Sequence, residues 1–137
     1  MSRIAKGSFQ VKLAALEFEG QAEGSMLGRM GIDKAISGDL LAITQGQMLS
    51  AMTATQGSAG YVAIERVEGH LQGREGSFVL QHSGRMDRGA QSQTITVVPD
   101  SGTGALTGLT GEFRILRVDG KHNYEFSYEL PEGPAAA

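Results

Sequence analysis

The chain has 137 residues and no cysteine, which excludes disulfide frameworks, thiol nucleophiles and cysteine-based zinc sites. Its formal net charge is −3 and it has no long basic run, so the electrostatic footprint of nucleic-acid binding is missing. The 20 glycines are about 15% of the chain against a usual ~7%, and they leave little room for long helices because glycine disfavours helix interiors.

Localisation and cofactors are inferred from what the sequence lacks. The N-terminal residues MSRIAKGSF contain no apolar signal-peptide stretch, and no window approaches the ~18 apolar residues of a membrane span. We therefore expect a cytoplasmic protein with no membrane partner and no nucleic-acid partner. The serine-hydrolase and zincin motifs are absent, and the glycine-rich segment DSGTGALTG lacks the third glycine of a dinucleotide fingerprint. No cofactor is predicted.

Short alternating apolar runs, separated by turns that contain glycine, are typical of an all-β sandwich or barrel. In chain order, the expected strands are 9–18, 27–37, 39–50, 61–71, 77–87, 93–98, 112–118 and 122–130. The segment near 101–109 breaks this pattern, since capping residues followed by Ala105, Leu106 and Leu109 at helical spacing predict one short helical turn. We expect one barrel domain over 1–130 and a disordered tail over 131–137.

A ten-residue pattern, G-x-L-x-G-x-x-G-x-F, occurs at 69–78 and again at 104–113. Two copies are too few for a solenoid, which needs at least three repeats to bury a core. We interpret the pattern as a recurring barrel corner in which glycines allow bends and close backbone approach. The alternative is a duplicated ligand-binding edge.

Three segments resemble a known family: GYVAIERVEGHLQGREGSFVLQH at 60–82, TITVVPDSGTGALTGLTGEFRI at 94–115 and DGKHNYEFSYEL at 119–130. They are similar to the uncharacterised bacterial DUF3224 family, whose structures resemble the allene oxide cyclase barrel. The resemblance implies an eight-stranded antiparallel β-barrel with a small interior cavity, in agreement with the strand count. It assigns no catalytic residue, and an activity taken from the fold would be analogy alone.

Several polar side chains share the apolar faces of the expected strands, where an ionisable group needs a partner. Lys34 is in phase with Ile32 and Ile36, and His82 follows Phe78 and Leu80. Strand 61–71 has two candidate inner faces. We choose the one with Glu65 because its carboxylate would then face Lys34. The candidate catalytic acid/base residues are Glu65 and His82, and the expected ligand-binding residues are Lys34, Tyr61, Phe78, His122, Tyr124 and Tyr128.

Other interpretations of these polar residues stay open. The inner cluster could be a network that fills the barrel and fixes strand register rather than a ligand site. A metal site could be built from His70, His82, His122 and Glu65, but nothing in their spacing demands it, and we predict no metal.

The sequence leaves three functions open. The first is a cofactor-independent isomerase or cyclase acting on a small, mostly apolar molecule. The second is a module that binds such a molecule without changing it, and the third is a filled barrel that acts only as a homo-oligomeric scaffold. Expected strands 27–37 and 39–50 carry apolar residues on both faces, so we predict a homo-oligomer, with a dimer favoured.

Overall fold

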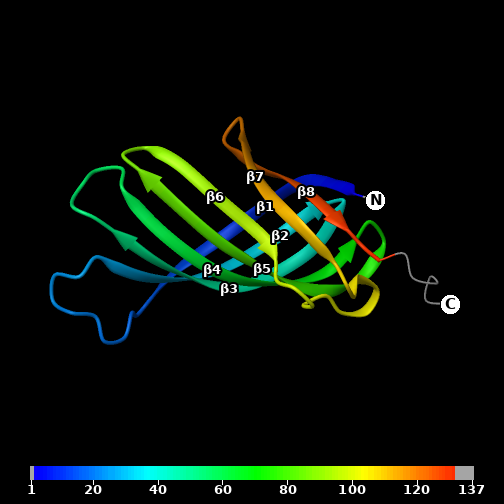
Figure 1. Cartoon of the computed structure of the whole chain (residues 1–137), viewed down its shortest axis with the longest axis horizontal. Coiled ribbons are helices and arrows are strands. Elements are labelled where there is room, and N and C mark those ends of the chain that lie inside the picture. The colour runs from blue at the N-terminus through cyan, green and yellow to red at the C-terminus, as the bar shows by residue number, and fades with distance from the viewer. Residues whose placement is uncertain (1, 132–137) are drawn as a thin grey trace.

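The computed structural model of the protein describes residues 2–131. Eight antiparallel strands form a closed barrel in which each strand pairs with the next and β8 pairs with β1 (Figure 1). The elements are β1 (Arg3–Leu16), β2 (Leu27–Gly38), β3 (Leu40–Met52), β4 (Ala59–Leu71), β5 (Arg74–Asp87), β6 (Ala90–Val97), η1 (Gly104–Leu106), β7 (Thr110–Val118) and β8 (Lys121–Glu129). The predicted all-β barrel is confirmed. Most of the predicted disordered tail lies outside the described residues.

Most element boundaries differ from the sequence prediction by one to three residues, and larger differences occur at the start of β1 and near 101–109. Strand β1 begins at Arg3 rather than at residue 9, because its first residues pair with β8 from Arg3↔Tyr128 to Phe9↔His122. The helical turn near 101–109 is shorter than expected. The hydroxyls of Ser101 and Thr103 accept hydrogen bonds from the backbone N–H groups of Val79 and Ser77, at 3.0 and 3.1 Å. These side chains complete the edge of β5, so only Gly104–Leu106 is helical.

One end of the barrel is filled by aromatic and aliphatic side chains. Rings stack in this interior: Phe78 on β5 and Phe126 on β8 have centroids 5.7 Å apart, and Phe113 on β7 and Tyr124 on β8 have centroids 5.1 Å apart. The fully buried Leu106, which belongs to η1, packs in the same cluster. This packed half contains the hydrophobic core.

The two copies of the glycine pattern meet at this packed end. A side chain at Gly76, in the first copy, would overlap the carbonyl oxygen of Thr103, which directly precedes the second copy. Gly73 lies in the β4–β5 turn with a φ of 86°, a conformation that favours glycine. The pattern therefore serves the close packing of one barrel end, as the barrel-corner interpretation predicts.

The opposite end, which we call the mouth, is open. Strands β5 and β6 pair continuously from Leu80↔Val97 to Asp87↔Ala90, whereas β6 and β7 share one paired position, Thr96↔Glu112. In Figure 1 the tip of the β7–β8 hairpin accordingly stands apart from β6. No helix within residues 2–131 has the length and apolar character needed to cross a membrane.

Candidate functional site

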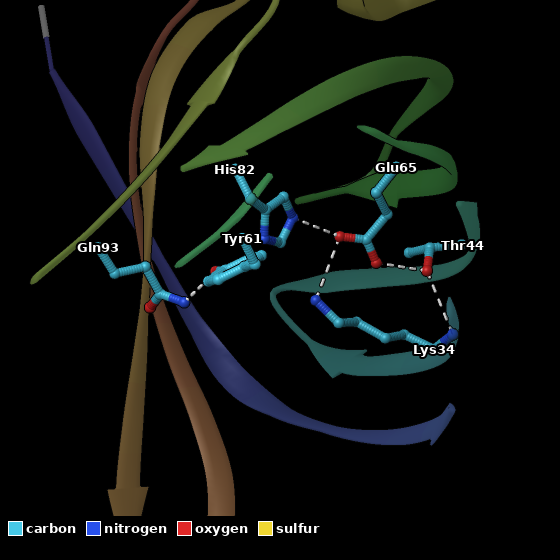
Figure 2. Close-up of polar contacts among 6 residues, drawn as sticks. All are labelled: Lys34, Thr44, Tyr61, Glu65, His82 and Gln93. Atoms are coloured by element: carbon cyan, nitrogen blue, oxygen red, sulfur yellow. Dashed lines mark hydrogen bonds and ion pairs between the residues drawn. The ribbon is translucent and has the colours of Figure 1, made fainter. Parts of the chain in front are cut away.

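A buried polar cluster lies on the inner face of four adjacent strands (Figure 2). The Glu65 carboxylate on β4 is at its centre. Its Oε1 lies 3.1 Å from Lys34 Nζ on β2 and 2.9 Å from His82 Nε2 on β5, and its Oε2 accepts a hydrogen bond of 2.6 Å from Thr44 on β3. Glu65 and Lys34 both point inward, as the choice of inner face predicted.

A glycine on the neighbouring strand allows this arrangement. Gly46 on β3 is directly opposite Glu65 on β4. A Cβ at Gly46 would overlap the carbonyl oxygen of Ile64 and come within 2.8 Å of the Glu65 Cα. Strands β3 and β4 could then no longer approach so closely, and the Thr44 hydroxyl would lose its position against the carboxylate.

The partners of Glu65 decide its charge. Burial raises the pKa of this carboxyl, but the hydrogen bond from His82, the charge of Lys34 and the hydrogen bond from Thr44 together lower the pKa from 4.5 to about 2. The group is therefore ionised at neutral pH. A carboxyl whose pKa is lower in the folded chain stabilises the fold above pH 4.5, and this contribution is lost as the pH falls toward 2.

Lys34 is held by aromatic rings as well as by Glu65. Its Nζ lies 4.8 Å from the centroid of Phe9 and 5.9 Å from that of Phe113. Cation–π attraction to both rings compensates part of the free-energy cost of desolvating the ammonium group. Lys34 therefore neutralises Glu65 while two rings of the hydrophobic core lie against its ammonium group.

His82 faces the mouth. Because Glu65 is an ionised acceptor, His82 Nε2 must carry the proton of their hydrogen bond. The other ring nitrogen, Nδ1, makes no hydrogen bond within residues 2–131. The imidazole itself is buried, with His82 only 4% exposed. Glu65 and His82 thus form a dyad whose second ring nitrogen is available as a hydrogen-bond acceptor.

A cavity of about 330 Å³ lies beside this dyad, at the mouth between β3, β4, β5 and β6. Its lining includes Met48, Met52, Tyr61, Met86, Gln91 and Gln93. The Tyr61 ring separates the cavity from His82, meeting the imidazole edge-on with centroids 6.3 Å apart, and its hydroxyl accepts a hydrogen bond from Gln93 Nε2 (Figure 2). A side chain at Gly84 would overlap this ring, so glycine there fixes where the cavity wall stands.

The family model described as "Protein of unknown function (DUF3224)" matches residues 5–128. The chain belongs to the DUF3224 family. It is also similar to the crystal structure of a protein of unknown function from that family, from Shewanella oneidensis MR-1. The two are 49% identical, the match covers 97% of this chain and 100% of the other, and the TM-score is 0.91. No curated protein matches the chain.

In this DUF3224 barrel, the predicted ligand-binding residues occupy separate places. Tyr61 lines the cavity and Lys34 joins the polar cluster. Phe78, Tyr124 and Tyr128 lie in the packed half, where the Tyr124 hydroxyl accepts a hydrogen bond of 2.9 Å from the Leu40 N–H. The sixth predicted ligand-binding residue, His122, is half-buried and stacks on Phe9 with centroids 5.0 Å apart.

The histidines of the alternative metal site do not come together. His70 is exposed and lies 3.4 Å from Glu75 on the outside of the barrel, whereas His82 is in the inner cluster and His122 is beside Phe9. Across residues 2–131, no group of three or more histidine, aspartate or glutamate side chains is placed to hold a metal ion.

The cavity methionines were missed by the sequence reasoning. Met48 and Met52 continue the inward phase of Thr44 along β3, and Met86 continues that of His82 along β5. Extending the two-residue alternation of inward side chains from the core to the strand ends therefore predicts these methionines on the inner face.

Replacing Glu65 tests whether the cluster is a coupled unit. Glu65→Gln leaves the Lys34 ammonium buried without a countercharge, so we expect the free energy of unfolding to fall by about 3–5 kcal/mol. The double variant Lys34→Met/Glu65→Gln removes both charges and keeps the hydrogen-bonding amide, so it should be more stable than Glu65→Gln alone. Urea unfolding of both variants and of Lys34→Met measures this. Losses that simply add would show that the pair is not coupled.

Proposed function

We propose that the protein binds a small, mostly apolar molecule in the mouth cavity. The observation that carries this proposal is the form of the cavity itself. It is a concave space of about 330 Å³, lined by three methionines and by the hydrogen-bonded pair of Tyr61 and Gln93. This volume is at the lower end of the ~300–1,000 Å³ range of small-molecule sites.

The asymmetry of the barrel supports the mouth as the binding site. The packed half is closed by stacked rings and by Leu106, whereas the mouth is widened by the short β6–β7 pairing. Glu65 and Lys34 satisfy each other between these halves and leave no unpaired buried charge facing a ligand. A binding module needs only this cavity, so binding is the simplest of the three functions.

Within this proposal, the group suited to proton transfer is His82 rather than Glu65. The carboxylate already interacts with three partners and its pKa of about 2 keeps it ionised, so it cannot donate a proton at neutral pH. His82 Nδ1 is free within the described residues, but the Tyr61 ring lies between it and the cavity. An isomerase or cyclase activity therefore also requires Tyr61 to move aside, and we place it second to binding.

Filling the cavity tests the binding proposal. Ala59 lines the cavity at the start of β4, so Ala59→Trp should occupy the space, whereas Ala14→Trp adds the same bulk to the exposed outer face of β1. With a neutral compound such as 1-octanol, we expect saturable amide chemical-shift changes at 48–52, 59–61 and 84–86. Ala59→Trp should weaken this binding at least ~10-fold and Ala14→Trp should not.

The result against binding would be the absence of saturable shifts from the wild-type protein. Shifts confined to the outer face of β3 and β4 would also contradict it. Native mass spectrometry of the freshly purified protein gives the complementary readout, because a molecule that co-purifies with the wild type should be absent from Ala59→Trp.

A second candidate function, self-association, is favoured by the outer face of β3 and β4. Ile43 is 68% exposed and Ile64 is 53% exposed, and Leu49 and Val62 pair across the two strands with their side chains outward. We propose that this face joins two copies of the chain in a homodimer.

Light scattering tests the dimer. At micromolar concentrations we expect twice the chain mass of 14.4 kDa, and Leu49→Lys/Ile64→Lys should reduce it to the monomer mass because two ammonium groups would be buried at the interface. Ile4→Lys, on the exposed face of β1, is the matched control and should leave the mass unchanged. A monomeric wild type would contradict this proposal.

A further inference from the structure

We propose that the ligand of the mouth cavity is an uncharged aromatic compound of one or two rings with a single hydrogen-bonding substituent, such as a phenol or an aryl carbonyl. This inference rests on the proposed binding function and names the class of ligand that the same cavity would take. Three features support this ligand class: the thioether groups of the cavity, the Tyr61–Gln93 pair and the charges nearby.

Three thioethers surround the cavity. Met52 on β3 and Met86 on β5 both pair with Ala59, one from each side, so the small alanine leaves the space between them open. Met48 lines the cavity deeper in the barrel, toward the level of His82. Methionine sulfur makes favourable contacts with aromatic rings and its flexible chain adapts to their edges. The volume of about 330 Å³ suits one or two rings.

One wall of the cavity offers a donor and an acceptor side by side. The Tyr61 hydroxyl accepts a hydrogen bond from Gln93 Nε2, so its own proton is available to a ligand. The Gln93 side-chain oxygen makes no hydrogen bond to any residue of 2–131. A phenol can donate to this oxygen and accept from Tyr61, and an aryl carbonyl can accept from Tyr61. One polar substituent is therefore enough to satisfy the pair.

The charges nearby favour a neutral ligand. Burial, opposed in part by the Gln93 hydrogen bond and reinforced by the negative charge of Glu65, raises the pKa of Tyr61, so the phenol remains a neutral donor. Glu65 and Lys34 behind this ring are paired with each other, so neither offers a free countercharge to a ligand ion. Arg85 is the cationic residue in the lining, but it is exposed on the outer phase of β5, where water screens it.

Four ligands of related shape separate these contributions: 2-naphthol, its saturated analogue decahydro-2-naphthol, naphthalene and 2-naphthoate. We expect calorimetric titration to show that the wild type binds 2-naphthol roughly tenfold more tightly than the saturated analogue. Met48→Leu/Met86→Leu keeps the apolar volume and removes two sulfurs, so the ratio should fall to about twofold. Met26→Leu, exposed and outside the cavity lining, is the matched control and should leave the ratio unchanged.

Replacing Tyr61 tests the hydrogen-bonding wall. Tyr61→Phe should weaken the binding of 2-naphthol roughly five- to tenfold and leave the binding of naphthalene unchanged. Only 2-naphthol has a hydroxyl group that can hydrogen-bond to the Tyr61 hydroxyl. Equal affinity for 2-naphthol and its saturated analogue, or a ratio unchanged by the methionine substitutions, would overturn the aromatic assignment and leave apolar binding intact. Tighter binding of 2-naphthoate would overturn the neutral assignment. If none of the four binds while 1-octanol does, the aromatic assignment fails and the proposed function stands; if 1-octanol does not bind either, both fail.

Discussion

The ionised carboxylate of Glu65 is the constraint on which the rest of the interior depends. A buried charge is costly unless it is paired and hydrogen-bonded, and this one has partners on three other strands. Meeting that need fixes the register of β2, β3, β4 and β5 at the middle of the barrel, and it requires glycine at position 46. The same cluster also marks the boundary between the packed half and the open mouth.

The two halves of the barrel differ in how their side chains pack. In the packed half, rings stack and the Tyr124 hydroxyl meets backbone groups of the β2–β3 connection, so aromatic residues there serve packing. In the mouth, β7 leaves β6, Gly84 makes room for the Tyr61 ring, and methionines replace the rigid core residues. The rigid packed half beneath the flexible methionine side chains of the mouth suits a site for a small molecule.

Alternation along strands predicted much of this arrangement. The inner face with Glu65 was chosen because its carboxylate would meet Lys34, and the ion pair is present. Alternation gives the side of the sheet but not the depth along the barrel, so Tyr124 and Tyr128 were grouped with Tyr61 although they belong to the packed half. The N-terminal part of β1 was missed because Lys6 and Gly7 weaken the apolar pattern there, and only pairing with β8 defines it.

The charge state of Glu65 can be measured directly by following its side-chain carboxyl carbon in a ¹³C-labelled sample by NMR as the pH is lowered. The resonance should stay at its ionised position from neutral pH to about pH 3, with a midpoint near the pKa of about 2 that its partners impose. A midpoint at or above the ordinary value of 4.5 would contradict the account, because the carboxylate would then not be held by Lys34, Thr44 and His82.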